Sequence, residues 1–330
     1  MSTSRVHTTD RVARNRLWGP HKRAPAGPLT LPGADPLGHD DRVTHARPPL
    51  EVSALRALLL APAGPLARLD VVDATASTNA DVVAALRREP VAWPHASLLV
   101  ADHQTHGRGR TGRTWLTPAR SALTCTFVAR PRSGPETYGW LPLLAGLGTV
   151  RALRATTGVR AVLKWPNDVL VDLGPDADDL EGWGTARKVA GILAEVVPDA
   201  GPGPAVAVGI GVNVDQAADE LPVPWATSLA LAGARDTARS TVLTALVGAL
   251  DEVASRWAEG GGDAAATGLA DEVAAVCATL GRAVAVELPD GSTLRGTARR
   301  LDADGALVVA DGDGRERTVH AGDVRHVRGA

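Results

Sequence analysis

The sequence contains only two cysteines, Cys125 and Cys277, which lie far apart and form no CxxC pair. This usage supports neither a disulfide framework nor a cysteine zinc site, and it favours a reducing compartment, so we expect a cytoplasmic protein. No run of about 18 apolar residues occurs, and the basic N-terminal segment has no apolar stretch. We therefore expect neither a membrane span nor a secretory signal.

The chain also lacks an excess of charge of either sign. Its 35 Lys and Arg are balanced by 37 Asp and Glu, which gives a formal net charge of -2. No chain-wide basic field can attract nucleic acid or an anionic membrane, so any polyanion site must be local. Phe and Tyr occur once each beside eight Trp, most of which we expect in the core. At roughly 150 residues per domain, the length predicts about two domains.

Residues 1–48 mix Arg, His, Pro, Gly and Asp and show neither a helical nor a strand period. Such a segment cannot bury enough apolar area to offset the entropy of ordering, so we predict a disordered leader. The alternative is a DNA-binding helix-turn-helix, which would make the protein a repressor. That motif needs periodic apolar helices, and here the pattern is interrupted by Pro20, Pro25, Pro28, Pro32 and Pro36.

Between residues 49 and 280, short apolar runs alternate with longer periodic stretches. Helices are predicted after Glu51 and over 77–88, 141–157, 238–259 and 271–280. Strands are predicted over 69–72, 97–101, 123–128, 159–163, 189–197 and 205–214. The pattern indicates an α+β domain in which a mixed sheet is layered with flanking helices.

Residues 281–330 have a different texture. Five short strands are predicted over 283–288, 293–301, 306–310, 315–320 and 324–328, separated by tight Asp- and Gly-containing turns. This spacing predicts a small separate β-barrel of about fifty residues. The turn at 311–314, with the sequence DGDG, lacks the full ligand series of a calcium loop, so ordinary turn chemistry explains it better.

The most informative segment is 107–115, with the sequence GRGRTGRTW. It contains GxGxxG, but a dinucleotide fingerprint needs a helix at the glycines, whereas Trp115 and Pro118 follow here. The chain has no Walker loop. What remains is a flexible loop with three arginines and no acidic residue between Asp102 and Glu136. Its forked donors suit phosphate or carboxylate oxygens, so we expect an anion to order it, the alternative being a solvated basic loop.

Three further segments have a composition that core packing does not require: Ser77-Thr78-Asn79, KWPND at 164–168, and KVAGIL at 188–193 followed by GIGVN at 209–213. Together with the arginine loop, they closely resemble the biotin protein ligase family. The resemblance implies a catalytic domain like that of class II aminoacyl-tRNA synthetases and an SH3-like C-terminal barrel. It also implies ATP-dependent activation of biotin to biotinyl-5′-AMP, with Mg²⁺, and transfer to a lysine of a biotin carboxyl carrier domain of an acyl-CoA carboxylase.

The resemblance assigns biotin to Ser77, Thr78 and Asn79, together with Gln104. Short hydroxyl and amide groups suit a ureido ring, which offers donors and a carbonyl acceptor. From the residues alone, the first three form a helix N-cap before 80–88, and Gln104 is an ordinary loop glutamine. Both explanations stay open at this point.

By the same resemblance, Arg108 and Arg110 lie over the biotin carboxylate and the ATP phosphates, and Arg113 assists them. They would stabilise charge while the carboxylate attacks the α-phosphorus. Gly107 and Gly109 let the backbone approach the ligand closely. Trp115 is expected to form a wall for the adenine, although a core aromatic at a strand entry is the alternative.

Lysine and carboxamide side chains complete the implied site. Lys188 contacts the biotin carboxylate and the reacting phosphate, Lys164 and Asn167 bind the nucleotide, and Asp168 orients or deprotonates the acceptor lysine. A solvated strand-edge lysine and an Asx-turn are the alternatives for Lys188 and Asn167. Close approach of the ligand explains glycine inside strands at Gly191, Gly209 and Gly211.

Several expectations concern what surrounds this site. Residues 172–187 form an acidic insertion relative to the family pattern, read as a solvated loop. His103 and His106 have too few companions to argue for a metal site, so the magnesium ligands are unknown. We expect a monomer or weak homodimer that does not bind nucleic acid. The competing functions are a lipoate ligase or acyltransferase of the same fold, a biotin-responsive repressor, and a non-catalytic binding module.

Overall fold

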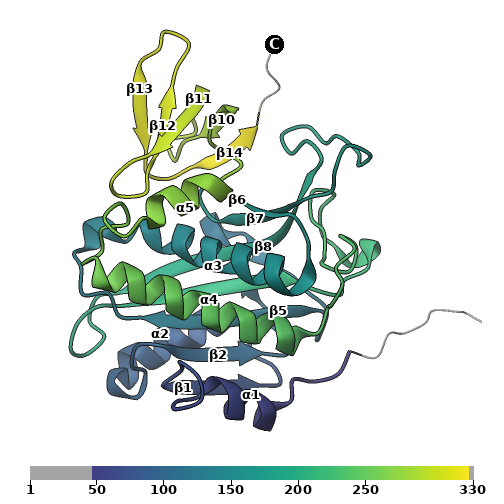
Figure 1. The fold of residues 1–330 in the computed structure, drawn as a ribbon, viewed down its shortest axis with the longest axis vertical. Coiled ribbons are helices and arrows are strands. Elements are labelled where there is room, and N and C mark those ends of the chain that lie inside the picture. The colour runs from purple at the N-terminus through teal and green to yellow at the C-terminus, as the bar shows by residue number, and fades with distance from the viewer. Residues whose placement is uncertain (1–46, 327–330) are drawn as a thin grey trace, which may run out of the picture. The chain divides into compact units, whose positions relative to one another are not determined.

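The computed structural model describes residues 47–326, and its main element is a seven-stranded mixed sheet (Figure 1). The first two strands pair in parallel, and every other neighbouring pair is antiparallel. In spatial order the strands are β1 (Arg68–Val72), β2 (Ser97–Ala101), β5 (Ala122–Ala129), β9 (Ala205–Asn213), β8 (Ala186–Val197), β7 (Asp168–Asp172) and β6 (Ala161–Lys164). The predicted mixed sheet is therefore confirmed.

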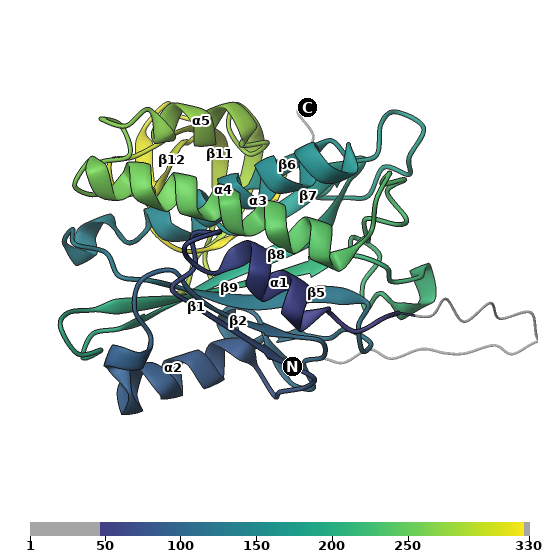
Figure 2. The same ribbon diagram turned by 60° about the horizontal axis from the view of Figure 1, so that its bottom comes forward.

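Helices cover both faces of this sheet (Figure 2). One face carries α1 (Val52–Leu59), α3 (Trp140–Thr157) and α4 (Arg239–Glu259), and their buried leucines and valines share one core with β5, β8 and β9. The other face carries α2 (Thr78–Arg88), which packs Val82 and Leu86 into a second core with Leu99 and Val128. The sheet is thus sandwiched between two apolar layers.

The C-terminal part is a five-stranded antiparallel sheet that follows α5 (Leu269–Val276). Its spatial order is β13 (Glu316–Val319), β12 (Leu307–Ala310), β11 (Thr293–Leu301), β10 (Ala283–Glu287) and β14 (Asp323–His326). Two buried tryptophans attach it to the larger domain: the indole of Trp140 donates to the carbonyl of Ala303 at 2.7 Å, and that of Trp165 to Gly305 at 3.1 Å. The five predicted strands are confirmed.

The structure corrects one boundary of the sequence-based description and adds strands that it missed. Arg47 and Pro48, assigned to the leader, belong to the folded part: Arg47 pairs with Glu220 at 2.6 Å, and the carbonyl of Pro48 accepts a bond from Arg239 at 2.7 Å. The rest of the predicted leader, with its possible helix-turn-helix, lies outside the described residues. Strand β7 was not predicted, and neither was the hairpin of β3 (Gly107–Arg108) and β4 (Thr114–Trp115). No helix within 47–326 is long and apolar enough to cross a membrane.

Candidate active site

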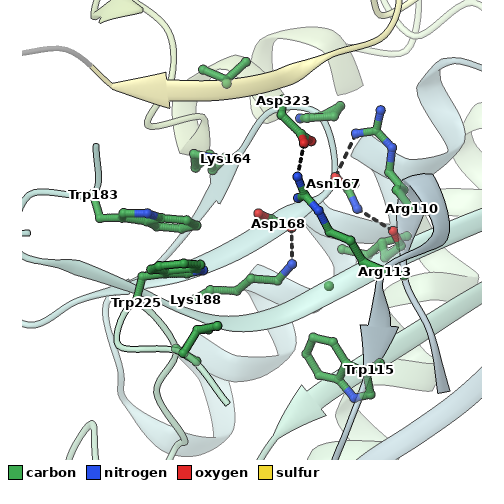
Figure 3. A pocket seen from close by; sticks show the side chains of 18 of the residues that line it. Arg110, Arg113, Trp115, Lys164, Asn167, Asp168, Trp183, Lys188, Trp225 and Asp323 are labelled. Carbon is green, nitrogen blue, oxygen red and sulfur yellow. Dashed lines mark hydrogen bonds and ion pairs between the residues drawn. The ribbon is translucent and has the colours of Figure 1, made fainter. Parts of the chain in front are cut away.

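A cleft of about 1790 Å³ lies between the central strands of the large sheet, the β3–β4 hairpin and the C-terminal sheet (Figure 3). Its lining includes every predicted site residue except Gly107. Gly107 lies behind the cleft in β3, where a Cβ would stand 2.4 Å from the carbonyl oxygen of Trp115. The four motifs, which are dispersed along the sequence, are therefore brought together in one place.

One end of the cleft is built on the N-terminus of α2. Ser77 is the N-cap, and its hydroxyl accepts a bond from the amide of Ala80 at 3.4 Å, as the capping interpretation predicted. The amide and hydroxyl of Thr78 donate to the side-chain oxygen of Gln104 at 2.8 and 3.0 Å. All three side chains are buried, and they present polar groups to the cleft.

Asn79 lies deeper at the same end and is held by three hydrogen bonds. Its oxygen accepts from Thr126 at 2.7 Å, while its nitrogen donates to the carbonyl of Leu193 at 3.0 Å and to Glu195 at 2.9 Å. The side chain passes directly over Gly209, where an added Cβ would stand 2.2 Å from the Asn79 oxygen. Glycine at 209 is therefore required by the amide that packs on it.

Each arginine of the 107–115 segment has a protein partner from a different part of the chain. Arg108 faces Glu195 at 3.8 Å, Arg110 donates to the side-chain oxygen of Asn167 at 3.0 Å, and Arg113 pairs with Asp323 of β14. Tertiary structure thus supplies acceptors that the local sequence lacks, and the ordering of this segment by an anion stays a prediction. A short turn closes the hairpin, with Thr111 at φ 51° and Gly112 at φ 74°.

The middle of the cleft floor is formed by Trp115 on the sheet. A Cβ at Gly211 would stand 2.7 Å from the indole, and one at Gly191 would stand 3.3 Å from it. The ring is half-buried, and its N–H has no hydrogen-bond partner among the described residues. Trp115 therefore lies in the cleft and not in the core, as the resemblance implied.

At the other end of the cleft, the carboxylate of Asp168 lies near two lysines. Asp168 and Lys164 are direct partners across the β6–β7 hairpin, and Lys188 of β8 contacts the Asp168 carboxylate at 2.6 Å. Burial alone would raise the pKa of Asp168, but Lys188, Lys164 and Arg110 lower it below its ordinary value. Burial is also the main reason why the pKa of Lys164 is lowered. This end consequently carries excess positive charge and suits an anion.

Asn167 connects the arginine hairpin with the sheet. Its side-chain nitrogen donates to the carbonyl of Ile192 at 2.7 Å, and its oxygen accepts the bond from Arg110. Burial lowers the pKa of Arg110, which marks a partly desolvated guanidinium. The Asx-turn alternative is not what the structure shows, because the bonds of the side chain go to remote residues.

The sequence reasoning missed two tryptophans in the cleft wall. Trp183 comes from the acidic insertion and stacks on Trp225, with ring centroids 5.8 Å apart and planes 9° apart (Figure 3). Residues 179–184 line the cleft, so reading the whole insertion as a solvated loop was wrong. A tryptophan among acidic and glycine residues was the available signal.

Within 47–326, no group of three or more His, Cys, Asp or Glu residues is arranged to hold a metal ion.

Comparisons with known proteins show the family to which this fold and site belong. Residues 71–215 match the Biotin/lipoate A/B protein ligase family, and residues 279–327 match the Biotin protein ligase C terminal domain. The chain is 38% identical over 286 residues to the Biotin--[acetyl-CoA-carboxylase] ligase of Mycobacterium tuberculosis, which covers 86% of this chain and 97% of that relative. It therefore belongs to the biotin protein ligase family, a family of ATP-dependent ligases.

Two other similarities bear on the open alternatives. The structure of the Aquifex aeolicus biotin protein ligase in complex with biotin and ATP superimposes with a TM-score of 0.60 at 27% identity, covering 78% of this chain and 97% of that one. The Bifunctional ligase/repressor BirA of Bacillus subtilis is 28% identical over 46% of this chain and 43% of its own length. The match over residues 279–327 supports the expected biotin protein ligase family and not the alternative of a lipoate ligase.

Proposed function

We propose that the protein activates biotin with ATP and transfers it to a protein lysine. In the first step the biotin carboxylate attacks the α-phosphorus, biotinyl-5′-AMP forms, and pyrophosphate leaves. In the second step the lysine amine attacks the acyl carbonyl, AMP leaves, and an amide forms. The observation that carries this proposal is the arrangement of three cations around Asp168 beside a polar pocket: Lys188 contacts the carboxylate at 2.6 Å, and Lys164 and Arg110 act on it through space.

The charge distribution of the cleft suits the first step. Both reactants are anions, so their approach requires cations that are positioned before the reaction begins. Lys188 contacts Asp168 at 2.6 Å and Arg110 donates to Asn167 at 3.0 Å, so both cations face the cleft beside the end built from Lys164. We assign the reacting carboxylate and the α-phosphate to this position, with Arg108 and Arg113 on the adjoining part of the hairpin. The protein partners of the arginines would be exchanged for ligand oxygens.

The two ends of the cleft suit the two ends of the adenylate. Thr78, Asn79 and Gln104 offer hydroxyl and amide groups in a buried setting, as a ureido ring needs. Trp115, backed by Gly191 and Gly211, offers an aromatic face and an unpaired indole N–H for the nucleotide. Asn167 is placed to read the donor and acceptor edge of adenine after releasing Arg110.

Of the two roles that the sequence left open for Asp168, orienting the acceptor lysine and deprotonating it, we propose the first. Because its pKa is lowered, the carboxylate is ionised at neutral pH and is a weak proton acceptor. It suits orienting the acceptor ammonium or amine better than removing its proton. The acceptor would be the lysine of a biotin carboxyl carrier domain of an acyl-CoA carboxylase.

The remaining assignments extend the same proposal. Residues 49–280, which hold the large mixed sheet, would carry catalysis as a class II aminoacyl-tRNA synthetase-like domain. Residues 281–330, which hold the antiparallel sheet, would form an SH3-like barrel. Magnesium would arrive with ATP, bound by its phosphates and by several waters. We further propose a cytoplasmic monomer or weak homodimer that does not bind nucleic acid.

The decisive experiment is ATP–pyrophosphate exchange with biotin, lipoate or octanoate as the acid. We expect exchange with biotin only, and biotinyl-5′-AMP in the product mixture by mass spectrometry. Exchange with lipoate or octanoate alone would identify a lipoate ligase or acyltransferase of the same fold. Biotin binding without any exchange would identify a binding module.

A further inference from the structure

The insertion between β7 and β8 has a defined structure of its own. Leu180 and Gly184 form an antiparallel bridge, and the buried Arg187 donates to the carbonyls of Asp178 at 2.5 Å and Gly184 at 2.9 Å. The amide of His326 donates to the carbonyl of Gly182 at 3.3 Å. The tip of the insertion is therefore anchored on both sides, and Trp183 at that tip has a fixed position.

Trp183 is placed between an aromatic neighbour and a cation. Its ring stacks on Trp225, whose carbonyl accepts the amide of Lys188 at 2.7 Å. On the other side, the ammonium of Lys164 stands 4.6 Å from the centroid of the Trp183 ring (Figure 3). This distance is within the range of a cation–π contact.

Lys164 needs such a contact more than an ordinary lysine does. Only 5% of the residue is exposed, and burial is the main cause that lowers its pKa. The carboxylate opposite it, Asp168, is in contact with Lys188 instead. A buried ammonium without a carboxylate in contact is unfavourable, and the ring face is a group in contact with it that offsets part of this cost.

We propose that Trp183 is a positioning residue of the active site: its ring keeps the Lys164 ammonium charged and directed into the cleft, ready for an anionic ligand group. This inference rests on the proposed function, which places Lys164 among the cations of a cleft that binds two anionic substrates. It assigns a role to an insertion that departs from the family pattern. Trp225 supports the ring from behind and does not itself contact Lys164 in this arrangement.

The other charges around Lys164 determine the sign of the expected effect. Asp168 and Asp323 favour its charged form, whereas Lys188, Arg113 and burial oppose it, and His326 is a further titratable neighbour. Removing the ring deletes a favourable contact of the charged form only. The pKa of Lys164 must then fall further, and the ammonium is lost at a lower pH.

The test compares Trp183→Leu with Trp183→Phe, which keeps an aromatic face, and with Asp176→Asn as a matched change in the same insertion. We expect Trp183→Leu to reduce kcat/KM for ATP about tenfold at alkaline pH and to move the alkaline limb of the exchange profile to lower pH. Trp183→Phe should recover most of this loss, and Asp176→Asn should leave the profile unchanged. A uniform loss of activity with an unshifted limb would mean a purely structural role and would overturn the proposal.

A second measurement does not depend on ligase activity. Lysines are labelled by ¹³C reductive methylation, and the Lys164 resonance is assigned by its absence in Lys164→Arg. Its titration midpoint should lie lower in Trp183→Leu than in the wild type and should be restored in Trp183→Phe. An unchanged midpoint refutes the inference even if no exchange activity is found, whereas a lowered midpoint in an inactive protein would count against the proposed function alone.

Discussion

Replacing Gly209 by alanine tests the biotin end of the site most directly. The new methyl carbon would stand 2.2 Å from the side-chain oxygen of Asn79, whereas ordinary contacts begin near 3.4 Å. Both Gly209 and its neighbours lie within the hydrogen-bonded strand β9, so the Asn79 amide must move instead. We expect Gly209→Ala to impair biotin binding while leaving the sheet intact.

The magnitude follows from the three hydrogen bonds of Asn79. At about 1 kcal/mol each, their loss would cost up to about 3 kcal/mol of stability, offset by roughly 0.5–1 kcal/mol because alanine suits a strand better than glycine. The net change should lower the Tm by several degrees. Displacing the amide from the ligand should weaken biotin binding by at least about tenfold, which corresponds to ~1.4 kcal/mol.

Isothermal titration with biotin and thermal unfolding measure the two effects separately. Gly248→Ala is the matched control, because nothing lies within 4 Å of a Cβ at that position in α4 and alanine favours a helix. It should leave biotin binding unchanged and raise the Tm slightly. Wild-type biotin affinity in Gly209→Ala would show that Asn79 has no part in the biotin site.

Three further outcomes are expected. Removing the cation of the buried Arg239–Asp102 pair, 2.7 Å apart, by Arg239→Leu should destabilise the protein by about 3–5 kcal/mol in chemical denaturation, and a loss below ~1 kcal/mol would contradict this. Burial lowers the pKa of His326 to about 4, so stability should be full above pH 6.5 and fall as the pH drops toward 4; His326→Phe should flatten this dependence of Tm on pH. Asp168→Asn should spare biotinyl-5′-AMP formation more than transfer to the carrier in single-turnover assays, and equal losses would exclude a role in orienting the acceptor.

Features with a local physical cause could be predicted from the sequence. The N-cap at Ser77 depends on its own helix. The sequence singled out the glycines at 209 and 211 but attributed them to a ligand, whereas the structure packs the remote side chains of Asn79 and Trp115 on them. The layered sheet follows from apolar periodicity, and the turns of the C-terminal sheet follow from their Asp and Gly residues.

The rest depends on residues remote in sequence. Glu195 and Asp323 meet the arginine hairpin only through the tertiary fold, so the local sequence could not reveal these partners. Strand β7 begins at Asp168 directly after the turn, and no local signal separates it from that turn. The structured insertion was hidden by its acidic composition, which is typical of a solvated loop.

The attachment of the C-terminal sheet implies an asymmetric tolerance to substitution. Trp140 and Trp165 donate to backbone carbonyls of residues 303 and 305, so the acceptors persist whatever side chain position 303 carries. A saturation scan should therefore find residue 303 permissive and both indoles restrictive. The C-terminal sheet of a homologous chain could therefore replace this one if the backbone of the turn at 303–305 followed the same path, even where the side chains of that turn differed.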